Sequence, residues 1–144
     1  MFTSLKRFAV LTLLMVAVSP ILAMRVTFDY RVFHAPEIGP YAEFVTSFDA
    51  STFQHRSLDS GYVQANAELM LVLSGGGKIL DARKVLVDGP QIKGNDRDDF
   101  LSIERFTVPP GKYSLELEVR DLNAADGKVE RLIQEIEITV PASG

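Results

Sequence analysis

The sequence predicts an all-β domain that folds as an antiparallel β-sandwich, and two observations lead to this class. Apolar and polar residues alternate with a period of two in successive runs, which is typical of strands with one buried face. Turn-forming residues separate these runs at intervals of about 12 to 20 positions, and no helix of consequence is needed. Because each apolar face must be covered by a second sheet, we expect an immunoglobulin-like or fibronectin-like sandwich of about seven strands. A β-barrel is the alternative.

The N-terminus has the layout of a secretory signal peptide. Lys6 and Arg7 form a short positive region, and the almost uninterrupted apolar run of residues 8–18 follows it. This run is shorter than the ~20 residues that a membrane-spanning helix needs, so we expect a cleaved leader rather than an anchor. The predicted organisation is a signal peptide over residues 1–23 and one β-sandwich domain over residues 24–144. The protein would then be exported, either to the periplasm or out of the cell.

Seven segments carry the alternating pattern. They span residues 26–33, 41–48, 63–73, 78–87, 99–108, 113–120 and 135–140. The third segment is the most regular, because apolar residues alternate there with Gln64, Asn66 and Glu68. We therefore expect it at the centre of a sheet, with these three polar side chains on the opposite face.

Glycine and proline mark two of the turns. Gly75, Gly76 and Gly77 come before Lys78, but a phosphate-binding loop would also require glycine at Val72. The glycines therefore predict a tight hairpin turn. A Pro-Pro-Gly corner comes shortly before Tyr113, where sandwiches often place a tyrosine whose hydroxyl bonds to the preceding backbone.

The composition excludes several classes of function. The chain has 15 Lys and Arg against 19 Asp and Glu, for a net charge of −4, and removal of Lys6 and Arg7 takes it to −6. Nucleic acids and anionic membrane surfaces both require a basic face, so we expect neither as a partner. The absence of cysteine excludes disulfides, cysteine-bound zinc and a thiol nucleophile. We predict no cofactor and no stable membrane span after leader cleavage.

A short acidic segment contains the candidate metal ligands, Asp96, Asp98 and Asp99. Their carboxylates, together with Asn95, are the kind of oxygen ligands that calcium uses, although the spacing is not that of an EF-hand loop. A solvated surface loop is the more favoured interpretation.

The two histidines are the candidates for general-base chemistry. His34 is close in sequence to Glu37, and His55 is close to Asp59. A hydrolase would also need a positioned nucleophile, and no serine here occupies a recognisable nucleophile elbow. We therefore interpret both histidines as ordinary loop residues and consider a hydrolase the least favoured function.

Tyr41 and Tyr62 are the candidate ligand-binding residues. Both have outward parity on predicted strands, so they could form a small platform on which a sugar ring stacks. Exposed tyrosines on sheets more often pack across strands, and the chain has no tryptophan. Glycan binding is therefore the alternative function.

Several segments, taken in order, carry a resemblance to a known family. They are residues 28–36, 39–43, 48–51, 62–65, 105–113 and 120–123. Together they resemble the N-terminal module of the bacterial GWxTD-domain proteins, an uncharacterised group of exported proteins. The tryptophan-bearing motif that names this family is absent, since the chain has no Trp. The resemblance implies an exported β-sandwich and supplies no catalytic residues.

These observations favour a non-enzymatic exported module with a protein-interaction or structural role in the cell envelope. Such a module would present a sheet edge or a loop end to a protein partner. The candidate edges are the first and last predicted strands. On the last strand and just before it, Arg131, Glu135 and Glu137 would discourage aggregation, because charged side chains on an edge oppose unspecific pairing.

Overall fold

The computed structural model describes residues 24–139 of the chain. The predicted signal peptide lies outside the described residues, as does Val140 at the end of the seventh predicted strand. In the described part, no helix is long and apolar enough to cross a membrane.

Residues 24–139 contain nine strands and two single turns of 3-10 helix, which are joined by turns and loops. The strands are β1 (Val26–Ala35), β2 (Gly39–Phe48), β3 (His55–Ser57), β4 (Tyr62–Gly75), β5 (Lys78–Asp88), β6 (Ile92–Lys93), β7 (Phe100–Phe106), β8 (Gly111–Asp121) and β9 (Val129–Ile138). The two turns are η1 (Ala50–Thr52) and η2 (Asp59–Gly61). Seven of these strands are the predicted ones, and β3 and β6 are too short for an alternating pattern to reveal them.

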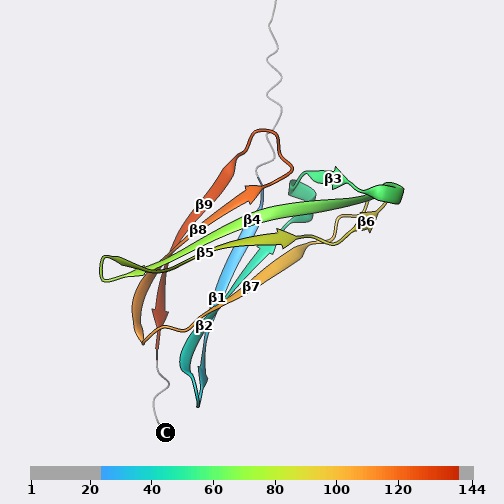
Figure 1. Cartoon of the computed structure of the whole chain (residues 1–144). Helices are drawn as coiled ribbons and strands as arrows, with labels where there is room; N and C mark the ends of the chain where they lie inside the picture. Colours follow the sequence, from blue (N-terminus) through green and yellow to red (C-terminus); the bar gives the residue numbers. More distant parts are fainter. Residues whose placement is uncertain (1–23, 140–144) are drawn as a thin grey trace, which may run out of the picture.

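The strands form two antiparallel sheets, which Figure 1 shows as two layers. One sheet has the order β1-β2-β7, and the main part of the other has the order β5-β4-β8-β9. The long central strand β4 also pairs with β3 and β6 near its start. Within residues 24–139, no backbone ladder joins β1 to β9 or β5 to β7. The fold is therefore a sandwich and not a closed barrel.

The core forms between the inner faces of the two sheets. On β2, the alternating positions Ala42, Phe44, Thr46 and Phe48 are all buried, as the two-residue period of the predicted strand 41–48 requires of one face. Leucines from β4 and β8 meet them from the other sheet: Leu69, Leu71, Leu73 and Leu115 are fully buried. Aromatic pairs such as Phe44 with Phe106, whose ring centroids lie 5.1 Å apart, fill the space between the sheets.

The predicted tyrosine corner and glycine hairpin both form, and they pack on each other. The hydroxyl of Tyr113 donates a hydrogen bond to the carbonyl of Pro109. Gly76 and Gly77 have φ angles of 59° and 76°, as a two-residue hairpin turn requires. A Cβ atom on Gly75 would lie 2.8 Å from Cδ1 of Tyr113, so only glycine fits there. This end of the sandwich therefore depends on glycine for turn geometry and for close packing.

Two details differ from the expectation. The last strand begins at Val129, although the sequence revealed it only from Glu135, because Leu132 and Ile133 are adjacent and break the alternation. Gln64 and Asn66 are each only 7% exposed, although their parity predicted a solvated face. Gln64 Nε2 donates to the carbonyl of Gly89 in the loop after β5, at 2.9 Å. Asn66 Nδ2 donates to Oδ1 of Asp88 at the end of β5, and Asn66 Oδ1 accepts from Nδ2 of Asn123.

Candidate functional site

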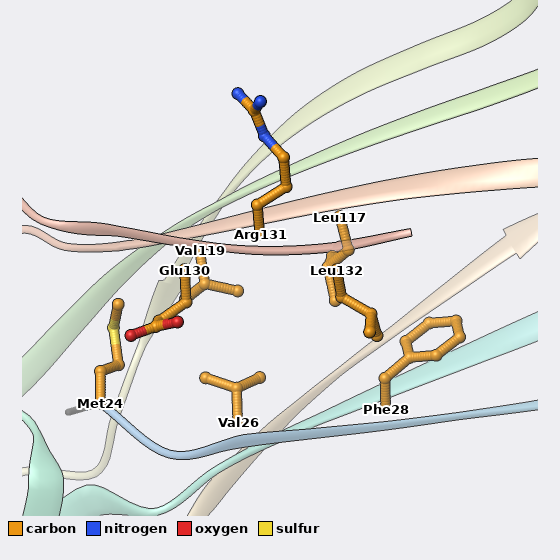
Figure 2. Close-up of a pocket in the computed structure, with 8 residues that line it drawn as sticks. All are labelled: Met24, Val26, Phe28, Leu117, Val119, Glu130, Arg131 and Leu132. Atoms are coloured by element: carbon orange, nitrogen blue, oxygen red, sulfur yellow. The ribbon is translucent and has the colours of Figure 1, made fainter. Parts of the chain in front are cut away.

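An apolar groove of about 180 Å³ opens between the edge strands β1 and β9. Its walls come from the start of β1, from β8 and from the first half of β9, as Figure 2 shows. The residues that line it are Met24, Val26, Phe28, Leu117, Val119, Glu130, Arg131 and Leu132.

The register of the strands decides which side chains enter the groove. Leu132 lies opposite Leu117, and Glu130 lies opposite Val119, so both residues of β9 share the inner face of β8. On β1, Val26 and Phe28 face inward with the same two-residue period. Figure 2 shows these side chains converging from the two sheets.

The floor of the groove belongs to the core, and its rim is open to solvent. The ring of Phe28 stacks on Phe44 with centroids 5.7 Å apart, and Leu117 is only 3% exposed. Leu132 at the rim is 41% exposed. A ligand that entered here would cover apolar surface that the fold leaves in water.

The charges at the groove are divided between its two sides. Arg131 points away from the groove (Figure 2), and its Nε lies 3.2 Å from Oε1 of Glu116. Its hydrogen bond with Glu118, followed by the charges of Glu118 and Glu116, raises the pKa of Arg131 above its usual value. Glu130 therefore supplies the carboxylate inside the groove, while the cation stays on the outer face.

A second polar cluster lies where β3, β4 and the end of β8 meet. Asn123 Nδ2 donates to the carbonyls of Gln54 and Gln64 and to Oδ1 of Asn66, at 2.9 to 3.2 Å. The carboxylate of the buried Asp121 accepts from the backbone amides of Gln54 and Asn123. Among residues 24–139, no buried side-chain nitrogen or oxygen lacks a partner. This cluster therefore holds the loops together without need of a ligand.

The structure places the two candidate tyrosines on different sheets. Tyr41 stacks on Phe33 across the β1–β2 hairpin, with ring centroids 5.4 Å apart. Tyr62 starts β4, and the ammonium of Lys93 lies 5.8 Å from its ring centroid. In Figure 1 the β1–β2 hairpin and the start of β4 lie at separate ends of the molecule. Tyr41 and Tyr62 therefore do not form a joint platform in this fold.

The acidic segment is a surface loop between β6 and β7. Asp96, Asp98 and Asp99 are all exposed, and Oδ1 of Asp99 accepts a hydrogen bond from the amide of Ala50 at 3.0 Å. In the described part of the chain, no three acidic, histidine or cysteine side chains gather as a metal site would require. Asp99 thus has a structural role in holding η1 against this loop.

The histidines form no catalytic pair in the described residues. His55 Nδ1 lies 3.1 Å from the carbonyl of Phe53, and His34 is an exposed residue of β1 opposite Pro40. Within residues 24–139, neither ring has a hydrogen bond or an ion pair with a serine, aspartate or glutamate. The two arrangements considered from sequence, His34 with Glu37 and His55 with Asp59, are not formed.

The sequence predicted the strand on the β1 side of the groove but not the part of β9 that forms the other side. The alternating segment 26–33 predicted a strand with one buried face, and Val26 and Phe28 lie on that face of β1. The segment that contributes Glu130 and Leu132 carried no alternating pattern, so it could not be assigned to a strand. The adjacent apolar pair Leu132 and Ile133 was the available signal, since an edge strand can be apolar on both faces.

Comparison with known proteins gives remote likenesses only. No family model matches the chain, and no curated protein is significantly similar. Among solved structures, a Bordetella pertussis protein provisionally named ApaA is 10% identical, with a TM-score of 0.38, and the match covers 83% of this chain and 97% of that one. A second structural genomics target is 12% identical, with a TM-score of 0.37, and the match covers 82% and 87%. These scores are too low to transfer a function to this chain.

Proposed function

We propose that this chain is an exported, non-enzymatic interaction module whose groove between β1 and β9 receives an apolar segment of a protein partner in the cell envelope. The observation that carries the proposal is the groove itself, with apolar walls and a solvent-exposed rim at Leu132. The leader-like N-terminus and the resemblance to the GWxTD-associated module support the exported setting.

The size of the groove favours a peptide side chain over a small-molecule ligand. Pockets for small molecules usually enclose about 300–1,000 Å³ and bury most of the ligand. The groove here encloses about 180 Å³, and Leu132 at its rim is exposed to solvent. It has room for one apolar side chain of an approaching chain.

The strands beside the groove favour the same kind of partner. Within residues 24–139, β1 pairs only with β2, and β9 pairs only with β8. Each therefore has one edge whose backbone groups can bind an extended segment, which is how many sheets recognise peptides. A partner could anchor one apolar side chain in the groove while its backbone follows an edge.

Site-specific photo-cross-linking in the cell that makes the protein tests this proposal. A photoreactive residue at Leu132 should give a covalent adduct with one discrete polypeptide, which mass spectrometry then identifies. Ile103 on β7 is the matched control, because it is 47% exposed, close to the 41% of Leu132, and β7 is the edge of the three-stranded sheet opposite to β1. The expected result is an adduct from position 132 and none from position 103.

Two results would contradict the proposal. The first is the absence of any adduct from position 132, and the second is an equal yield of the same adducts from both positions. An adduct with a lipid or a glycan in place of a polypeptide would also overturn it.

A further inference from the structure

Strand β9 has a free backbone edge whose orientation can be read from one contact. The amide of Glu137 lies 3.3 Å from the hydroxyl of Tyr30 on β1, so this amide points away from β8. Backbone groups in a strand alternate in direction, so the amides and carbonyls of Glu135, Ile133 and Arg131 also point outward. These groups have no ladder partner among the described residues, since β9 pairs only with β8.

The side chains along this edge are self-complementary in charge. Arg131, Ile133 and Glu135 share the outer face of the sheet, and the apolar residue lies midway between opposite charges. An antiparallel pair of two such edges, centred on Ile133, would place each Arg131 opposite a Glu135. Opposite charges directly across an antiparallel pair are stabilising, and like charges are destabilising.

We propose that a second copy of this chain pairs with the first along β9, antiparallel, with Ile133 opposite Ile133 of the partner subunit. The four-stranded parts of the two sheets then form one continuous sheet across a two-fold axis. The interface is isologous, as in most homodimers. This inference goes beyond the proposed function, because it assigns the free edge of β9 to a second copy of the chain and leaves the free edge of β1 to a different protein partner.

The charges select this register over its neighbours. Centring the pair on Leu132 would put each Arg131 opposite an Ile133 and so leave it without an opposite charge across the pair. Centring the pair on Arg131 would oppose two arginines, and centring it on Glu135 would oppose two glutamates. Centring it on Gln134 would bring Arg131 opposite Glu137, whose amide is already bound to Tyr30. The edge charges that discourage unspecific pairing thus permit one pairing of a chain with its own copy.

Burial of Ile133 favours the same arrangement. Its side chain is 62% exposed in a single subunit, beside Glu116 on β8. In the proposed dimer, the two copies of Ile133 cover each other at the centre of the interface. Because one strand pair makes a small interface, we expect a weak dimer that forms and dissociates with concentration.

Disulfide trapping provides a direct test, because the chain has no cysteine of its own. Ile133→Cys places the two thiols opposite each other on the two-fold axis, within the Cα separation that a disulfide requires. Leu86→Cys on the outer edge strand β5 is the matched control, since Leu86 is 67% exposed. Under mild oxidation of the purified protein, we expect at least a tenfold faster formation of covalent dimer by Ile133→Cys.

A charge exchange in the Ile133→Cys background tests the register. Arg131→Glu or Glu135→Arg alone should slow trapping several-fold, and the double variant should recover the rate. Thermal unfolding of each variant checks that the fold is intact, and sedimentation of the unmodified protein over a range of concentrations should show reversible dimers. Equal trapping rates at positions 133 and 86, sedimentation as a monomer at all concentrations, or no recovery in the double variant would overturn the proposal.

Discussion

The two lateral openings of the sandwich are closed to different extents. On one side, Arg83 of β5 reaches across to β7, where its guanidinium lies 3.8 Å from the ring centroid of Phe106. Its Nη1 also donates to the carbonyl of Arg105 at 2.7 Å and lies 3.4 Å from Glu104. On the other side, β1 and β9 leave the groove open, and Tyr30 bridges to Glu137 only at one end.

This difference shows what kind of side chain covers the lateral opening of a two-sheet fold. Register places Arg83 on the inner face of β5, opposite Leu71, and its long side chain has both an aromatic ring and oxygen acceptors to meet. The corresponding inner position on β9 carries Glu130, which lines the groove together with Met24, just before β1, and Val26 at the start of β1 (Figure 2). Among residues 24–139, this carboxylate has no hydrogen bond or ion pair with β1, so it does not bridge the two sheets as Arg83 does.

The largest expected effect is a difference between the two openings in the free energy of unfolding that is lost when a side chain is truncated there. Phe106→Ala should lower the free energy of unfolding by about 3–5 kcal/mol, because Phe106 is fully buried beneath Arg83. Leu132→Ala on the open side should lower it by about 1 kcal/mol or less, since Leu132 remains 41% exposed. Urea unfolding of both variants measures the two values. Equal losses of the free energy of unfolding in the two variants would mean that side chains cover the groove opening as fully as the opposite opening.

An intermediate effect concerns Arg83 itself. Arg83→Met keeps the apolar part of the side chain but removes the guanidinium that bridges to β7, so we expect a loss of about 1 kcal/mol. Arg105→Met is the control, because the side chain of Arg105 is 67% exposed and its ion pair with Glu43 should contribute about 0.5 kcal/mol or less. If the two variants lost the same stability, the bridge would not be what closes that side.

The smallest expected effect is a gain on the open side. Glu130→Leu puts an apolar side chain among Met24, Val26 and Val119, so it should raise the free energy of unfolding by about 0.5–1 kcal/mol. Glu135→Leu, on the outer face of the same strand, should leave stability nearly unchanged. Glu130→Leu should also reduce the photo-cross-link from position 132, because it fills the groove. A loss of stability in Glu130→Leu would show that the carboxylate has a favourable partner there.

Periodicity in the sequence was sufficient to predict most of the fold. The inward positions Phe44 and Phe48, the central place of β4 and the hydrogen bond of Tyr113 all follow from alternation and from turn chemistry. These are local properties, because each depends on residues close together in the chain. The candidate residues Tyr41 and Tyr62 also have the outward parity of their strands, but parity does not bring two strands together.

The sequence by itself determined the fold class, the seven long strands and the core face of most of them, since a two-residue period puts the alternating apolar side chains of a strand on the same face. Only the tertiary structure decided where β9 begins, why Gln64 and Asn66 are buried, and which lateral side stays open. Those features depend on pairs from distant parts of the chain, such as Arg83 with Phe106, or Gln64 with Gly89. Such pairs form only after strand register and the twist of both sheets have brought the two residues together, so no local sequence pattern predicts them.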